Sequence, residues 1–232
     1  MALKADPADQ ALLLDLQALD TKLQQLGHRA STLPEIATLA ALGAERETLQ
    51  RTVVEQTGAS EDAQTELKRT ESDVAVVEAR IARDSERLQS SASVKDVAAL
   101  EQELTALAKR KSDLEDIELA VMETAEERDA ALSSSRAALS DLDARIAEAT
   151  TARDAALSGL DHEREQAAAE RAAIAGKVPD DLLALYEKQR SRYGVGASLL
   201  QGGVSLASGV ALNSSDMSTI RAAAPDDVLL CA

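Results

Sequence analysis

The sequence predicts a mainly α protein, a long antiparallel two-arm coiled-coil hairpin followed by a small C-terminal α+β module. Aliphatic residues recur at alternating spacings of three and four from Leu12 to Ile174, the pattern by which two helices bury a narrow common seam. The chain of 232 residues has no Phe, no Trp and only two Tyr, too few aromatic side chains to fill a large globular core. After Gly176 the stripe ends and a segment richer in glycine follows.

The first arm is predicted over residues 7–88. Asp6 and Pro7 form a helix start, with an acidic N-cap before a proline at the first helical position. Pro34 interrupts the arm, because its ring would clash with the carbonyl group four residues earlier, and the apolar positions on its two sides follow different heptad frames. We therefore expect a break or kink near Pro34. The predicted seam positions are Leu12, Leu16, Leu19, Leu23, Leu26, Ala30 and Leu33, then Leu39, Leu42, Leu49, Val53, Ala63, Leu67, Val74, Val77, Ile81 and Leu88.

A tight turn is predicted at about residues 89–93, which contain no apolar side chain of seam size. Ser93, with Asp96 three residues later, resembles a capping box and indicates the start of the second arm, residues 94–175. Both arms have about 82 residues, so they fold back antiparallel, with partner numbers that add up to about 182. The seam positions of the second arm are Val97, Leu100, Leu104, Leu107, Leu114, Val121, Ala125, Leu132, Leu139, Leu142, Ile146, Ala149, Ala156, Leu160, Ala167 and Ile174.

A different kind of segment follows the second arm. Gly176 and Pro179 end the helix, and a short linker helix is predicted from Asp180 to the residue before Gly194. Short apolar runs, a helix opened by Ser214 or Ser215 and a strand over residues 227–231 then predict a small α+β module. We therefore divide the chain into a hairpin, residues 1–175, and a linker helix with its module, residues 176–232.

Composition restricts the classes of function. The net charge is −16, from 25 basic and 41 acidic side chains, which disfavours general attraction to nucleic acid or anionic lipid. The single cysteine, Cys231, rules out a disulfide within the chain. No apolar run approaches the roughly 18 residues of a membrane span, and the N-terminus has no signal-peptide pattern. We expect a cytoplasmic protein without membrane contact.

The segments VPDDLLALYEKQR, GVGASLL and SGVALNSSDMSTIRAAAPDDVLLC resemble a bacterial family, in its actinobacterial members above all. In that family a coiled-coil hairpin precedes a C-terminal C4-type zinc ribbon, and the same order of parts extends over this whole chain. The resemblance implies zinc held by two Cys-x-x-Cys knuckles. Here the first knuckle falls on Ser205 and Ser208, and the second begins at Cys231. Because neutral hydroxyls and a lone thiolate are poor zinc ligands, we expect no zinc and no other cofactor.

The sequence offers no constellation typical of an enzyme. The pairing rule places His28 opposite position 154, roughly 12 Å along the axis from His162, so the two histidines would not share a metal ion. A two-helix seam has no desolvated pocket in which paired carboxylates could act as acid and base. No glycine-rich phosphate loop or nucleophile elbow occurs either. We therefore expect the acidic residues to form a solvated charged face.

Two function hypotheses remain. The preferred one is a non-catalytic adaptor, scaffold or chaperone-like protein that contacts other proteins, with a homodimer as a further possibility. The family resemblance implies the same, since relatives in other bacteria are described as partners or chaperones of an alternative sigma factor, or of secretion and flagellar components. The alternative is nucleic-acid binding through the C-terminal module and one basic, aromatic cluster; otherwise Tyr186 packs the linker helix onto the ribbon and the basic side chains stay solvated. The cluster contains Tyr186, Lys188, Arg190, Arg192 and Tyr193.

Overall fold

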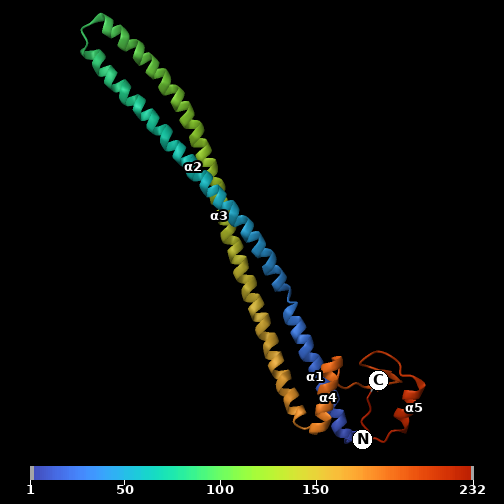
Figure 1. Cartoon of the computed structure of the whole chain (residues 1–232). Coiled ribbons are helices and arrows are strands. Elements are labelled where there is room, and N and C mark those ends of the chain that lie inside the picture. Colours follow the sequence, from blue (N-terminus) through green and yellow to red (C-terminus); the bar gives the residue numbers. More distant parts are fainter. Residues whose placement is uncertain (1–2, 231–232) are drawn as a thin grey trace. The chain divides into compact units, whose positions relative to one another are not determined.

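The computed structural model describes residues 3–230 and is mainly helical (Figure 1). The chain divides into two compact units. The terminal unit contains the chain up to Ile36 and from Thr151 onward, and the hairpin unit contains Ala37–Thr150. The predicted coiled-coil hairpin fold is confirmed. In order along the described residues, the elements are α1 (Pro7–Ser31), α2 (Pro34–Ser90), α3 (Val94–Ala175), α4 (Asp180–Tyr193), β1 (Leu200–Gln201), β2 (Val204–Ser205) and α5 (Ser214–Ala222).

In the hairpin unit, α2 and α3 run antiparallel and are joined by residues 91–93 (Figure 1). The turn is shorter than predicted, because Gln89 and Ser90 continue α2 and the Ser90 hydroxyl donates to the carbonyl groups of Glu86 and Arg87 at 3.2 and 3.1 Å. Ser93 caps α3 by accepting a hydrogen bond from the Asp96 amide at 3.4 Å. Every predicted seam position between residues 39 and 149 is buried or half-buried, so the heptad frames are correct.

Polar side chains occupy seam positions that the apolar pattern skips. Ser60, Thr70 and Asp84 are all buried. The Ser60 hydroxyl donates to Asp129 on α3 at 2.5 Å, whereas Asp84 accepts from Arg80 and from Arg87 on its own helix at 3.1 and 3.4 Å. The Thr70 hydroxyl donates to the Glu66 carbonyl at 3.1 Å. The seam is therefore only partly apolar, and these three polar residues each have a partner that offsets the loss of hydration.

The register away from the turn differs from the predicted pairing rule. That rule placed position 46 opposite position 136, but Arg46 Nε lies 2.6 Å from Asp143 Oδ1. It placed position 78 opposite position 104, but Glu78 pairs with Lys111 at 2.6 Å. The pair Arg80–Glu103, nearer the turn, still follows the rule. Side chains on a helix lean toward its N-terminus, which accounts for about one residue of the shift on each helix. Counting from the turn alone omits this shift.

The terminal unit has a core that joins distant segments. Leu13 and Leu16 of α1 pack with Val178 and with Leu182 and Tyr186 of α4. Leu16, Leu182 and Tyr186 are the largest fully buried side chains among the described residues. The spacing of four between Leu182 and Tyr186 places both on one face of α4. Helix α1 begins as predicted, since the Asp6 carboxylate accepts from the Ala8 amide at 2.8 Å.

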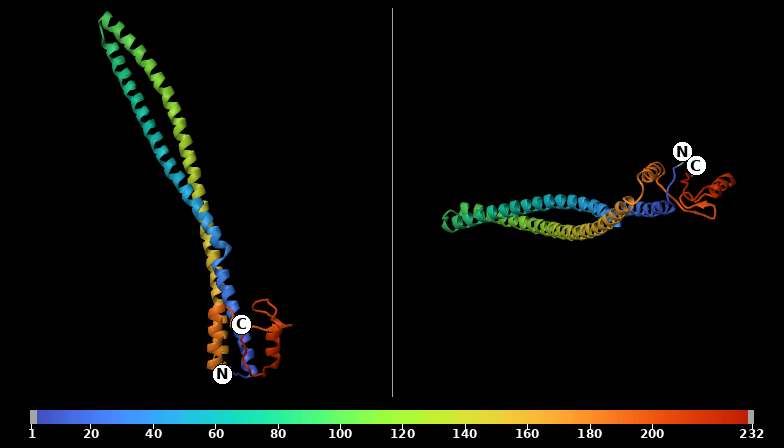
Figure 2. Two further views of the ribbon diagram at one scale, coloured as in Figure 1. Left: turned by 45° about the vertical axis from the view of Figure 1, so that its right-hand side comes forward. Right: turned by 90° about the horizontal axis from the view of Figure 1, so that it is seen from below.

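The two ends of the described chain lie side by side in the terminal unit (Figure 2). The Ala5 amide donates to the Asp226 carbonyl at 2.9 Å, and the Val228 amide donates to the Leu3 carbonyl at 3.0 Å. The strand predicted over residues 227–231 is not formed in its described part: Asp227 makes only an isolated bridge with Lys4. The reason is that the opposing segment is too short, because α1 begins at Pro7. Cys231 lies outside the described residues.

The C-terminal module, residues 195–230, contains the antiparallel β1–β2 pair and α5. Gly202 and Gly203, with φ of 58° and 80°, form the two-residue turn between the strands, a conformation that suits glycine. Helix α5 begins at Ser214, one of the two predicted positions, and Asn213 caps it by accepting from the Asp216 amide at 2.8 Å. No side chain of this module is fully buried. Within residues 3–230, no helix is both long and apolar enough to cross a bilayer.

Candidate functional site

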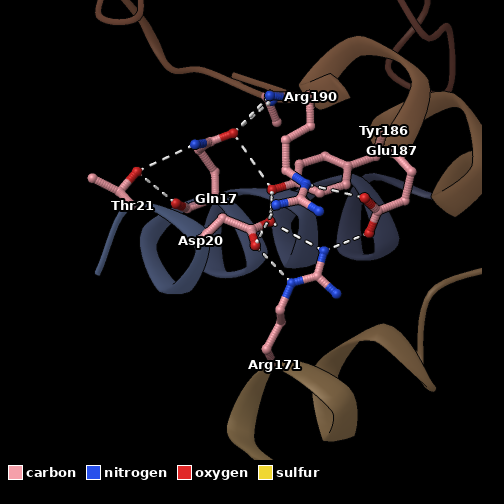
Figure 3. Close-up of polar contacts among 9 residues, drawn as sticks. Gln17, Asp20, Thr21, Arg171, Tyr186, Glu187 and Arg190 are labelled. Atoms are coloured by element: carbon pink, nitrogen blue, oxygen red, sulfur yellow. Dashed lines mark hydrogen bonds and ion pairs between the residues drawn. The ribbon is translucent and has the colours of Figure 1, made fainter. Parts of the chain in front are cut away.

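The main polar site of the terminal unit surrounds Asp20 (Figure 3). Asp20 follows Leu16 by four residues on α1, so both side chains lie on the buried face of the helix. Only 7% of Asp20 is exposed. Arg171 near the end of α3, together with Tyr186 and Arg190 of α4, points toward it (Figure 3). The site therefore joins three helices through one carboxylate.

Asp20 accepts four hydrogen bonds. Arg171 donates through Nε at 2.7 Å and through Nη2 at 3.2 Å. The Tyr186 hydroxyl donates at 2.7 Å, and Arg190 Nη1 donates at 3.0 Å. Charge-assisted bonds of this kind are the strong ones, and the forked guanidinium of Arg171 fits a carboxylate edge to edge. Asp20 is thus fully engaged with donors from its own chain.

Glu187 completes the cluster. Its carboxylate accepts from Arg171 Nη2, and also from Arg190 Nε at 3.0 Å. Two carboxylates and two guanidinium groups therefore balance each other in charge. This compensation matters because an unpaired charge is costly to bury.

The surroundings of the cluster stabilise the charged carboxylates and the neutral tyrosine hydroxyl. Burial alone would raise the pKa of Asp20, but the hydrogen bonds from Arg171 and Tyr186 and the two guanidinium charges outweigh it, so its pKa lies below the ordinary value. Burial would likewise raise the pKa of Glu187, but the hydrogen bonds and charges of the same two arginines outweigh it, so its pKa is also lowered. Burial and the bond to Asp20 raise the pKa of the Tyr186 hydroxyl. The cluster therefore holds fixed charges at neutral pH and is suited to holding helices together.

Gln17 extends the cluster toward the C-terminal module. Its side-chain oxygen accepts from the Gly196 amide at 2.6 Å and from the Ala197 amide at 3.4 Å. A Cβ atom on Gly196 would lie 2.5 Å from Cε2 of the Tyr186 ring, so only glycine fits this close approach. The chain leaving α4 is thereby fixed against α1.

The structure separates the predicted basic, aromatic cluster into two groups. Tyr186 and Arg190 face α1 and belong to the Asp20 site. Tyr186 thus packs α4 onto α1 and lies close to Gly196, and Ala197 and Val228 of the module pack against the same core. Lys188, Arg192 and Tyr193 are exposed, and the Arg192 guanidinium carbon lies 5.0 Å from the centroid of the Tyr193 ring.

Sequence reasoning missed four members of the site: Gln17, Asp20, Arg171 and Glu187. One signal could have identified Asp20, since it continues the spacing of Leu16 at the edge of an apolar stripe. Charged residues are rarely buried there without a partner. Nothing comparable points to Arg171, because its partner is 151 residues away.

The residues that the resemblance places at a first zinc knuckle, Ser205 and Ser208, do not fit a zinc ion. Ser205 lies in β2, and the Ser208 hydroxyl oxygen accepts a hydrogen bond from the Val210 amide at 3.3 Å. Both side chains offer neutral oxygen where structural zinc sites use thiolate or imidazole. Between residues 3 and 230 there is no group of three or more His, Cys, Asp or Glu side chains that could hold a metal ion. Cys231 lies beyond that range.

The spacing predicted for the two histidines is wrong. Arg29 forms an ion pair with Glu163 at 4.0 Å, so their neighbours His28 and His162 lie at similar levels of the α1–α3 pair. The register shift described for the hairpin unit applies here too. Both histidines are exposed, and the His162 ring bonds to the Gln166 side chain at 2.9 Å.

Known proteins resemble this chain over nearly its full length. The model of the CT398-like coiled coil hairpin domain matches residues 16–194. The uncharacterized protein Rv2229c of Mycobacterium tuberculosis H37Rv is 35% identical over 230 residues, which cover 99% of this chain and 94% of the relative. A solved structure from Mycobacterium smegmatis has a TM-score of 0.87 at 35% identity and covers 99% and 96% of the two chains. CT398 of Chlamydia trachomatis shares the fold, with a TM-score of 0.65 at 18% identity over 97% and 94%. The chain therefore belongs to the CT398-like coiled-coil hairpin family.

Proposed function

We propose that this protein is a non-catalytic adaptor or scaffold that contacts other proteins through its helical surfaces. The observation that carries the proposal is the narrow burial of α2 and α3. Each helix buries one stripe of seam residues, and its remaining faces are exposed. Such a surface provides a long series of contact positions, which is the usual role of extended coiled coils that lack an enclosed pocket.

The Asp20 cluster supports the same proposal. Its two carboxylates are paired with Arg171 and Arg190, and their pKa values lie below the ordinary range. A general acid or base at neutral pH needs a pKa near the working pH. This cluster is better suited to fixing α4 and the segment after it than to proton transfer.

The proposal is tested by affinity capture with the full chain as bait, followed by mass spectrometry. The matched control bait is an unrelated acidic antiparallel coiled coil of similar length. We expect specific proteins to be enriched over the control and to bind again when both partners are purified. If no protein is enriched over the control, the adaptor proposal fails.

Nucleic-acid binding is a second candidate because Arg192 and Tyr193 form an exposed cation–ring pair beside Lys188. Such pairs stack on bases and contact phosphate groups. The test is binding of single-stranded RNA and DNA at low salt by the wild type and by a Lys188→Glu, Arg192→Glu variant. Arg190 is left intact, since its change would disturb the Asp20 cluster. Loss of binding in the variant supports this candidate, and unchanged or absent binding removes it.

A further inference from the structure

One face of α3 exposes two apolar side chains away from the seam. Leu119 and Met122 are 57% and 40% exposed. They are three residues apart, so they lie next to each other on the helix surface. The seam in this part of α3 uses Leu114, Val121 and Ala125 instead. Packing within the hairpin therefore does not account for the apolar character of this pair.

Carboxylates surround the pair. Positions three and four residues before and after Leu119 and Met122 include five acidic residues, Glu115, Asp116, Glu118, Glu123 and Glu126. Glu115 has an ion-pair partner, Lys111 at 3.4 Å. No ion pair of the described chain involves the other four. Uncompensated like charges on one face repel each other and attract a cationic partner.

Exposed apolar residues of the hairpin do not all have this surrounding. Val54 on α2 is 67% exposed. Its neighbours three and four residues away are Gln50, Arg51, Thr57 and Gly58, none of them acidic. Apolar exposure and carboxylates thus coincide around Leu119 and Met122 but not around Val54, which makes Val54 a suitable control.

We propose that the face of α3 around Leu119 and Met122 binds a basic amphipathic helical segment of a partner protein, an inference that rests on the proposed adaptor function. Apolar anchors of the partner contact Leu119 and the adaptable thioether of Met122. Lysine or arginine residues beside those anchors pair with the surrounding carboxylates. Charge complementarity favours this occupant, because an acidic or uncharged helix would leave the four carboxylates without partners.

The probe is a synthetic leucine–lysine peptide of about 18 residues, patterned as an amphipathic helix. A peptide of the same composition in scrambled order is the control for simple charge attraction. Binding to the full chain is measured by calorimetry for the wild type, for a Leu119→Ser, Met122→Ser variant and for Val54→Ser. Since all three changed side chains are exposed, we expect unchanged circular dichroism and melting temperature.

The wild type and Val54→Ser should bind the patterned peptide with equal affinity. The scrambled peptide and the double variant should each give affinities about tenfold weaker. A Glu123→Gln, Glu126→Gln variant provides a second measure and should reduce the salt dependence of binding. Equal binding of the two peptides, an equal loss in Val54→Ser, or no binding at low salt would overturn the proposal. A wild-type dimer that the double variant abolishes would also overturn it, because a second copy would then cover this face.

The capture experiment distinguishes failure of this site from failure of the adaptor function. Partners captured equally by the wild type and the double variant would leave the adaptor function intact and remove this site. Peptide binding that depends on Leu119 and Met122, without any captured protein, would support the site and count against the adaptor function.

Discussion

The terminal unit and the hairpin unit are stabilised in different ways. In the terminal unit, Leu16 and Tyr186 are fully buried where α1, α3, α4 and the chain ends meet. In the hairpin unit, each seam residue has neighbours on one opposing helix only, and polar residues such as Asp84 interrupt the seam. A core that joins several segments loses more contacts when one side chain is removed than a two-helix seam does. We therefore expect the two units to respond differently to the same substitution.

The largest difference should come from truncating a leucine in each unit. Leu16→Ala should lower the free energy of unfolding by about 4 kcal/mol, because it leaves a cavity that several segments cannot fill. Leu114→Ala, at a buried seam position, should cost roughly 2 to 3 kcal/mol, since two helices can move together. Urea unfolding measures both, and hydrogen exchange locates each loss. Equal losses would contradict the contrast between the units.

The next largest effect concerns buried and exposed ion pairs. Asp20→Asn should lower the free energy of unfolding by about 3 kcal/mol. This is near the low end for breaking a buried ion pair, because Arg190 keeps some contact with solvent. Its matched control is Asp143→Asn, which removes the exposed pair with Arg46 and should leave the urea midpoint unchanged. If both variants behave alike, the Asp20 cluster does not stabilise the terminal unit.

Acid should weaken the terminal unit by a smaller amount. The folded pKa values of Asp20 and Glu187 lie below the ordinary values of 3.8 and 4.5. Their contribution to stability is therefore complete above those values and is lost as pH falls through the lower folded pKa values. Melting temperatures should be constant from pH 7 to about pH 5 on this account and fall below about pH 4. Asp20→Asn should show a smaller acid-induced fall than the wild type; an equal fall would assign the acid sensitivity to other groups.

The smallest effect should be that of metal removal. Because the serine hydroxyls of the C-terminal module do not fit zinc, we expect a chelator to leave the melting temperature unchanged. Elemental analysis should find no stoichiometric zinc in the purified protein. Stoichiometric zinc, or a chelator-dependent fall in melting temperature, would mean that a metal stabilises the module in addition to its contacts with Lys4 and Leu3.

Much of the helical structure could be predicted because its signals are local. Asp6 and Pro7 mark the start of α1, Ser93 caps α3, and Gly194, with φ of 78°, ends α4. The predicted seam residues are buried or half-buried from Leu12 to Ile174. They could be predicted because a heptad pattern indicates which face of a helix is apolar. The strand predicted at 227–231 was wrong in its described part, because strand formation depends on a partner that the apolar run does not reveal.

The sequence by itself determined where the helices begin and end, to within two residues at the end of α2, and which face of each is buried. Both properties depend on residues within a few turns of one another. Only the tertiary structure decided the register of α2 against α3, the inward orientation of Tyr186 and Arg190, and the meeting of Asp20 with Arg171. These depend on side-chain direction and on contacts between residues far apart in the sequence, for which helical periodicity carries no information.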